Sequence, residues 1–214
     1  QGKSIRFSGP NQALKTGIAM VQQELEQVAQ RSVMDNIWLG RYPKKGPFID
    51  DKRMYEETRR IINDFEVQID PKAKINQLSV STKQMVDIVK AVSYGAKIIV
   101  LDEPTSSLTA KETEALFKII RRLKEQGCGI IYISHKIDEV LHISDRVTVL
   151  RDGTWVATEE TKDMKVDRLI KLMVNREMND RFPPKKNVIG EASVRIENLS
   201  TFYSPRLSGI TFDA

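Results

Sequence analysis

The clearest hydrophobic pattern lies near the middle of the chain, where apolar positions change from strand-like to helical spacing and back. Residues 98–101 and 130–133 are short apolar runs of the kind that form buried strands. Between them, the apolar positions at helical spacing are Leu116, Ile120 and Leu123. Thr109 followed by Glu112 is typical of a capping box at the start of that helix. The alternation of strands and helices predicts an α/β fold with a parallel sheet.

Other stretches carry helical or hairpin patterns. Residues 51–65 place apolar side chains on one side of an amphipathic helix, and Met85, Val89 and Val92 indicate another. Asp152-Gly153 between two β-like runs is a strong hairpin signal. The remaining predicted elements are strands at 5–7 and 18–21, short helices at 136–143 and 166–176, hairpin strands at 147–151 and 154–158, a linker at 182–187, and strands at 194–199 and 210–212.

Composition limits the class of protein. The 214 residues suit one or two domains, and no run approaches the roughly 18 apolar residues of a membrane span. The net charge of +5 is spread along the chain, so it is weak evidence for nucleic-acid or membrane binding. The single cysteine excludes an internal disulfide. The chain starts with Gln1 in a strand-like pattern and ends just after another, so we expect it to be part of a longer protein.

Two adjacent carboxylates, Asp102 and Glu103, follow the strand predicted at residues 98–101. In parallel α/β sheets, ligands bind at the carboxyl ends of the strands. One carboxylate at such an end can hold Mg²⁺, usually through water, and the next can polarise an attacking water molecule. Pro104 then ends the strand because it has no N–H to donate. Taken alone, the same run also fits a buried strand that leads into an acidic turn, and both interpretations stay open at this point.

Four landmarks follow one another along the chain. Gln23 comes after a predicted strand, and Leu78-Ser79 opens a predicted helix. Asp102-Glu103 ends a strand, and His135 follows the next strand. In their order and spacing, these landmarks resemble the ATP-binding subunits of ATP-binding-cassette (ABC) transporters.

The sequence is most similar to the amino-terminal cassette of tandem ATPases in bacterial sugar importers, particularly those for galactose and methyl galactoside. Residues 30–43 and 127–136 carry the resemblance to the galactose importers, and the family resemblance covers essentially all 214 residues. It implies an α/β P-loop NTPase cassette with an inserted helical subdomain, truncated before the Walker A loop. The implied divisions are a remnant of the ATP-binding core (1–23), the helical subdomain with its signature segment (24–95), the core with Walker B, D-loop and switch histidine (96–180), a linker (181–193) and the start of a second cassette (194–214).

The resemblance also implies a role for each landmark. Glu103 is expected to be the general base, and His135 the switch histidine that contacts the γ-phosphate and fixes the attacking water. Gln23 is expected to position that water and to share Mg²⁺ with Asp102. The residues expected to contact ATP are Asp102, Ser79 and Ser81. The expected contacts with a second cassette lie in the D-loop, at Ser106, Ser107, Leu108 and Thr109.

Two features depart from the family pattern. The signature Leu-Ser-Gly-Gly-Gln is replaced by residues 78–82, Leu-Ser-Val-Ser-Thr, which adds side chains where backbone must approach a phosphate closely. Ser79 can still donate its hydroxyl, and the helix start still offers N–H groups to an anion. The Walker A sequence Gly-x-x-x-x-Gly-Lys-Ser/Thr is absent: Gly2-Lys3-Ser4 lacks the first glycine and precedes a predicted strand where a phosphate loop requires a helix. We therefore expect this chain alone to bind ATP poorly.

For the parent protein, the resemblance implies an ATPase that powers monosaccharide import with ATP and Mg²⁺ as cofactors. The implied partners are membrane permease subunits docked near residues 23–42, a periplasmic sugar-binding protein indirectly, and a second cassette of the same chain. The implied location is the cytoplasmic face of the bacterial inner membrane, and no nucleic acid is implied. Two other interpretations stay open: an ABC-type ATPase that acts on nucleic acid or the ribosome, and a non-enzymatic assembly module. A metal site at His135, Glu139 and His142 fits the spacing, but the family explains His135 better.

Overall fold

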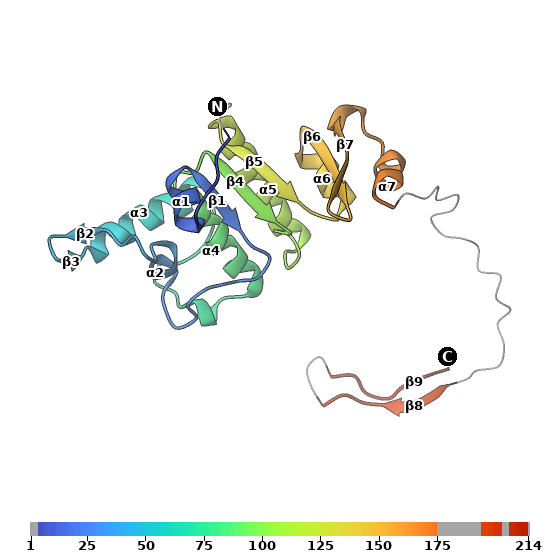
Figure 1. The fold of residues 1–214 in the computed structure, drawn as a ribbon. Helices are drawn as coiled ribbons and strands as arrows, with labels where there is room; N and C mark the ends of the chain where they lie inside the picture. The colour runs from blue at the N-terminus through green and yellow to red at the C-terminus, as the bar shows by residue number, and fades with distance from the viewer. Residues whose placement is uncertain (1–3, 175–193, 203–205, 214) are drawn as a thin grey trace. The chain divides into compact units, whose positions relative to one another are not determined.

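A computed structural model describes residues 4–174, 194–202 and 206–213 (Figure 1). The chain divides into two compact units, residues 1–175 and 176–214. Among the described residues, no helix combines the length and the apolar content that a membrane crossing requires.

A three-stranded parallel sheet in the order β1–β4–β5 forms the framework of the first unit. Its strands are β1 (Ile18–Val21), β4 (Ile98–Asp102) and β5 (Gly129–Ile133). These confirm the strands predicted from the three apolar runs. Val21 pairs with Leu101, and Asp102 pairs with Ile133, so the three strands end at the same edge. The residues that follow the strands therefore lie along the edge where parallel sheets bind their ligands.

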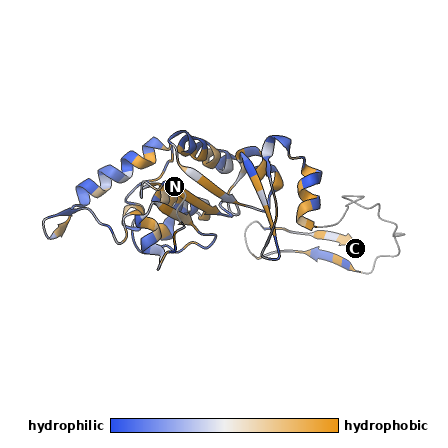
Figure 2. Cartoon of the chain, turned by 45° about the horizontal axis from the view of Figure 1, so that its top comes forward, coloured by the Kyte–Doolittle hydropathy of each residue, from blue (hydrophilic) through white to orange (hydrophobic). Residues whose placement is uncertain are grey.

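One face of this sheet packs against two helices, α4 (Val80–Val92) and α5 (Ala110–Glu125). The main hydrophobic cluster contains alternate strand residues and residues of both helices: Ala19, Val21, Met85, Ile88, Ala91, Ile99, Leu101, Leu116, Phe117, Ile119, Ile120 and Leu123. Within the described residues, the opposite face exposes Met20, Ile131 and Ile133. Figure 2 shows the strands as largely hydrophobic. Helix α5 begins with the predicted capping box, in which Thr109 and Glu112 each accept from the other's backbone N–H.

A second hydrophobic cluster lies among α2 (Val33–Ile37), α3 (Asp51–Asp64) and α4. Its buried members are Val33, Ile37, Ile62, Ile75, Val86 and Val89. Helix α3 matches the amphipathic helix predicted at 51–65, and its buried side chains are Met54, Thr58 and Ile62. Helix α4 contributes to both clusters, because Met85 and Ile88 belong to the first and Val86 and Val89 to the second. This helix therefore ties the helical region to the sheet.

A short antiparallel hairpin in the same region was not predicted. It consists of β2 (Lys44–Lys45) and β3 (Phe48–Ile49), and the 3₁₀ turn η1 (Ile75–Gln77) follows later. The sequence pattern at 43–47 indicated only a loop. Strands of two residues are too short to show the period-two alternation on which strand prediction depends.

A third group of elements follows the central sheet. It comprises α6 (Ile137–Ile143), β6 (Arg146–Arg151), β7 (Thr154–Glu160), the 3₁₀ turn η2 (Thr161–Asp163) and α7 (Val166–Val174). The predicted hairpin is confirmed: β6 and β7 pair antiparallel, and Asp152 and Gly153 have φ of 51° and 73°. Two consecutive positive φ values are what a type I′ turn requires, which explains the Asp-Gly signal. The small hydrophobic core of this third group of elements contains Val147, Val149, Met164 and Leu169.

The second unit contains an antiparallel hairpin of β8 (Arg195–Leu199) and β9 (Ile210–Asp213). This confirms the strands predicted at 194–199 and 210–212. The predicted linker at 182–187 and the end of the helix predicted at 166–176 lie outside the described residues.

The strand predicted at residues 5–7 is wrong. The described chain has no regular structure before α1 (Pro10–Lys15), a helix that the sequence interpretation missed. Pro10 stands in the first turn of this helix, where its fixed φ is favourable and its missing N–H costs nothing. The Gln12 side chain accepts from the Ser8 backbone N–H at 2.7 Å. This hydrogen bond stabilises the start of a helix. A strand would instead need backbone hydrogen bonds to a neighbouring strand, which the described residues do not supply.

Candidate functional site

Two of the predicted site residues meet at the carboxyl edge of the sheet. The Glu103 backbone N–H donates to the Ile133 carbonyl at 3.0 Å, which continues the pairing of β4 with β5. His135, two residues after β5, then donates its backbone N–H to Glu103 Oε1 at 3.1 Å. The His135 ring Nδ1 lies 2.8 Å from the same oxygen. The parallel register therefore brings together a carboxylate and an imidazole that are 32 residues apart in sequence.

The Glu103 carboxylate is held by one oxygen only. Its side chain is 15% exposed, and Oε2 is buried without a hydrogen-bond partner in the described residues. The residue also has φ of 46°, the left-handed region that non-glycine residues rarely adopt. The His135 side chain is 73% exposed. The carboxylate therefore bonds the segment after β5 through Oε1, while the buried Oε2 has no hydrogen-bond partner among the described residues.

Asp102 and Gln23 lie along the same edge without touching this pair. Asp102 is the last residue of β4 and is half-buried, whereas Gln23 follows β1 and is exposed. No hydrogen bond in the described part of the chain joins Gln23 to Glu103 or His135. The same residues contain no cluster of three or more His, Cys, Asp or Glu that could hold a metal alone. A hard cation at this edge would therefore take oxygen ligands from a bound substrate and water as well as from protein.

Ser79 and Ser81 form a separate group at the start of α4. Ser79 is the N-cap, and its Oγ accepts from the Thr82 N–H at 3.2 Å and lies 2.9 Å from Ser81 Oγ. Hydrogen bonds from Thr109 and from the Ser81 hydroxyl lower the pKa of the Glu112 carboxyl. The start of α4 therefore adjoins the first turn of α5. None of the described contacts joins Ser79 or Ser81 to Glu103, so the structure divides the predicted residues between two places.

The four residues expected to contact a second cassette, Ser106 to Thr109, lie in the turn between β4 and α5. The Ser106 N–H donates to the Glu103 carbonyl and the Leu108 N–H to the Thr105 carbonyl, each at 3.2 Å. Ser106, Ser107 and Thr109 are exposed, whereas Leu108 is half-buried against the main cluster. The turn thus presents polar side chains directly beside Glu103.

Sequence interpretation missed a polar network behind this pair. It consists of Thr105, Tyr132, Lys136 and Glu139, which are linked by hydrogen bonds of 2.6 to 3.2 Å. No spacing signal connects Thr105 with Glu139, because they come together only when β4 and β5 pair. The sequence offers Glu139 only as a metal ligand together with His135 and His142, and the described residues hold no such cluster. The His142 ring instead contacts Phe117, with 5.4 Å between ring centres.

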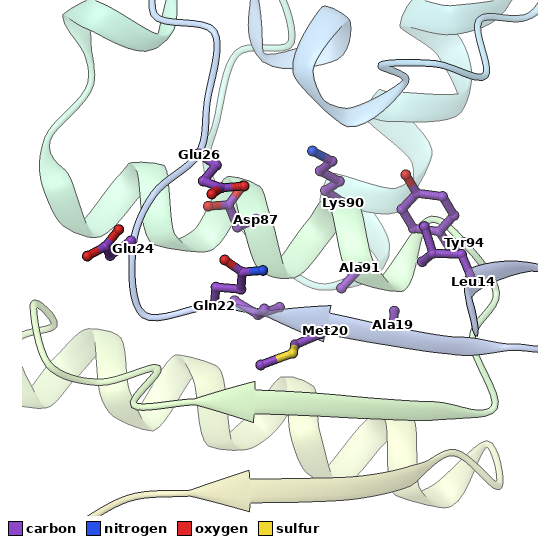
Figure 3. A pocket seen from close by; sticks show the side chains of 11 residues that line it. Leu14, Ala19, Met20, Gln22, Glu24, Glu26, Asp87, Lys90, Ala91 and Tyr94 are labelled. Carbon is purple, nitrogen blue, oxygen red and sulfur yellow. The ribbon is translucent and has the colours of Figure 1, made fainter. Parts of the chain in front are cut away.

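A cavity of about 210 Å³ lies beside β1, at the residues around Gln23 (Figure 3). Its polar lining residues are Gln22, Glu24, Glu26, Asp87, Lys90 and Tyr94. Burial raises the pKa of the Asp87 carboxyl, and the nearby Glu26 adds to the rise against the hydrogen bond from Gln27 and the charge of Lys90. Figure 3 shows the Glu26 and Asp87 carboxylates next to each other above β1. This cavity has an acidic side, which distinguishes it from a second cavity of about 820 Å³ bordered by Ser134 and His135.

Comparison with known proteins relates the chain to one family. A family model described as ABC transporter matches residues 1–106. The galactose/methyl galactoside import ATP-binding protein MglA of Escherichia coli K12 is 53% identical over 213 residues, which are 100% of this chain and 42% of that protein. MglA 2 of Photobacterium profundum is 52% identical over 212 residues, 99% of this chain and 42% of that protein. The chain thus spans less than half the length of these curated relatives.

Solved structures give the same fold. An ATP-binding cassette of an ABC transporter, MJ1267, matches with a TM-score of 0.66 and 22% identity over 78% of this chain and 71% of that chain. The ATP-binding cassette MJ0796, in a post-hydrolysis state bound to ADP and Pi, matches with a TM-score of 0.59 and 23% identity over 67% of this chain and 62% of that chain. The chain therefore has the cassette fold expected from its sequence.

Proposed function

The chain belongs to the ABC transporter family of ATP-binding proteins, and from this premise we propose that the whole protein carrying it hydrolyses ATP to drive monosaccharide import, of the galactose or methyl galactoside type. The observation that carries the proposal is the contact of Glu103 with His135 at the carboxyl edge of the sheet. The names of the related import proteins support the substrate class. They give no support to the alternative of an ATPase that acts on nucleic acid or the ribosome.

The residues at the edge fit the hydrolytic half of such a site. The Glu103 carboxylate, at the carboxyl edge of the sheet, would accept a proton from the attacking water. His135, held through Glu103 Oε1, would orient that water and donate toward a terminal phosphate oxygen. Asp102 and the amide oxygen of Gln23 would hold Mg²⁺, largely through water. Bound Mg-ATP supplies the phosphoryl bond that is broken and the cation that offsets the developing charge.

The residues that would cradle the phosphates fit less completely. Ser79 and Ser81 offer hydroxyls at the start of the 13-residue helix α4, where free N–H groups favour an anion. However, no Gly-x-x-x-x-Gly-Lys-Ser/Thr sequence occurs in the 214 residues, so the backbone nest and lysine of a phosphate loop are missing from this sequence. The proposal therefore concerns the whole protein, and this chain contributes the base, the switch histidine and the signature segment.

We place the docking of the permease near residues 23–42, beside the cavity of Figure 3. This segment connects β1 to the helical region, so a partner bound there would contact both parts. The proposed partners are permease subunits, through them a periplasmic sugar-binding protein, and a second cassette that contacts Ser106–Thr109. The proposed location is peripheral, at the cytoplasmic face of the inner membrane. Arg31 is exposed in this segment, so it suits a charge-reversal test, whereas Asp35 also forms a capping box with Ser32.

The test is ATP hydrolysis by the whole protein, with and without its permease, in the natural sequence and in Glu103→Gln. We expect the variant to lose at least about 100-fold in kcat, the lower range for a lost general base. Glu125→Gln, an exposed carboxylate at the end of α5, is the matched control and should leave kcat unchanged. Arg31→Glu should reduce only the stimulation by permease.

Each alternative has its own result in this assay. Full hydrolysis by Glu103→Gln would refute the assignment of the base. Absence of hydrolysis by the natural protein with permease present would favour the assembly module. Stimulation by RNA or DNA, weakened by salt, would favour the nucleic-acid alternative.

A further inference from the structure

A half-buried carboxylate, Glu139, accepts from three donors that lie in the same two segments as Glu103 and His135. Its Oε2 accepts from the Thr105 hydroxyl at 2.6 Å and from the Tyr132 hydroxyl at 2.7 Å. Its Oε1 pairs with Lys136 Nζ at 3.1 Å. The Glu139 side chain is 15% exposed and Thr105 is fully buried, so these bonds are largely shielded from water. Hydrogen bonds in such surroundings hold a single geometry more firmly than the same bonds at the surface.

The partners of Glu139 come from the two segments that carry the proposed site. Thr105 lies two residues after Glu103, and Lys136 directly follows His135. Lys136 Nζ also donates to the Thr105 carbonyl at 3.1 Å and to its hydroxyl at 3.2 Å. The network therefore joins the two segments at a second point, beyond the direct contact of Glu103 with His135. It also fixes the residue that begins the turn leading to Ser106–Thr109.

The network is consistent with an ionised Glu139. Burial alone would raise the pKa of this carboxyl, but the hydrogen bonds from Thr105, Tyr132 and Lys136 bring it below its ordinary value. Burial and the bond to Glu139 raise the pKa of the Tyr132 hydroxyl, which keeps it as a donor. Every partner therefore carries the hydrogen that the carboxylate needs.

We propose that Glu139 is a positioning residue for hydrolysis, which holds Glu103 and His135 at their working separation by clamping Thr105 to Lys136. The inference rests on the proposed function, because it names a further residue of the same site. Glu139 itself does not touch Glu103 or His135 in the described contacts, so its action is indirect. Displacement of a reacting group by about 1 Å costs on the order of 100-fold in rate, which makes a clamp of this kind measurable.

The test uses Glu139→Gln in the whole protein with its permease. The amide keeps the size of the side chain but loses the charge that pairs with Lys136 and one of the two acceptor oxygens. We expect kcat to fall by about 10- to 100-fold, while the KM for ATP and equilibrium binding of a fluorescent ATP analogue stay unchanged. Glu139→Asp, which keeps the charge, should recover part of the loss. Asp138→Asn, an exposed neighbour on α6, is the control.

Tyr132→Phe provides a second variant if Glu139→Gln does not fold. It removes one donor to Glu139 and retains the ring that packs against Phe117 at 6.2 Å. A smaller loss of kcat with unchanged KM would support the clamp. Unchanged kcat in both variants would overturn it, and so would a parallel loss of nucleotide binding, because a clamp acts on hydrolysis only. If Glu103→Gln retained activity, the proposed function would fail instead; if only the Glu139 variants retained it, this inference alone would fail.

Discussion

The hydroxyl of Thr58 joins α2 to α3, and its removal gives a sharp test of the packing in the helical region. Thr58 is fully buried, and its Oγ1 accepts from the Trp38 indole N–H at 2.8 Å. The same hydroxyl donates to the Met54 carbonyl at 2.7 Å. Trp38 is the C-cap of α2, so this bond fixes the end of one helix against the middle of another. The perturbation is Thr58→Val, which replaces the hydroxyl by a methyl group of similar size.

The expected cost follows from what each partner loses. The Met54 carbonyl keeps its place in the helical ladder, so the main loss is at the Trp38 N–H, which is left without a partner. An unsatisfied buried donor costs about 1–3 kcal/mol of the free energy of unfolding. For a protein of about this size, each kcal/mol lowers Tm by about 2–4 °C. Trp38→Phe removes the indole N–H donor itself. In a chain that already carries Trp38→Phe, the substitution Thr58→Val should therefore lower the free energy of unfolding by less.

The assay is a double-mutant cycle of Thr58→Val and Trp38→Phe, with unfolding by urea followed by far-UV circular dichroism. We expect a coupling free energy of about 1 kcal/mol or more between the two sites. Thr58→Ser is the control, because it retains the hydroxyl and should leave most of the coupling in place. Additivity within about 0.5 kcal/mol would refute the reasoning, since it would mean that the indole gains nothing from the hydroxyl.

Two further predictions concern pH and nucleotide. The pKa of Asp87 is raised in the folded chain from its ordinary value of 3.8. The contribution of Asp87 to the free energy of unfolding is therefore greatest below pH 3.8, and it is lost as pH rises through the pKa of the folded chain. Asp87→Asn should therefore raise Tm relative to the natural chain more at neutral pH than near pH 4; an equal difference at both would contradict it. Because the sequence contains no Walker A loop, the 214-residue chain alone should show no saturable Mg-ATP binding at micromolar nucleotide by titration calorimetry, and tight binding would show that other residues hold the phosphates.

Local sequence patterns predicted most of the elements on which the site stands. The apolar runs gave the strands β4 and β5, and the Thr109–Glu112 capping box gave the start of α5. The Asp152-Gly153 pair gave the hairpin turn because both positions need positive φ. These predictions succeed because each depends on side chains within a few residues of one another. The strand expected at 5–7 failed because a strand also needs a partner, which local sequence does not specify.

The candidate site residues could be named from the sequence, whereas their contacts could not. Asp102 and Glu103 could be recognised beside a strand, and the family resemblance supplied Gln23, Ser79, Ser81 and His135 as candidates. The contact of Glu103 with His135, and the separation of the two serines from it, became visible only in the folded chain. Sequence spacing gave no sign of the bonds from Thr105 and Tyr132 to Glu139.

The sequence by itself predicted the Thr109–Glu112 cap, the Asp152-Gly153 turn, the apolar runs of the central strands and the resemblance to ABC transporter cassettes. Tertiary structure alone decided which carboxylate oxygen of Glu103 is bonded, which is free, and how Glu139 is held. The physical reason is that these properties depend on the register of β4 with β5, which aligns residues more than 30 positions apart. Hydrogen bonds and burial across that register set the geometry of the site, and no local pattern encodes them.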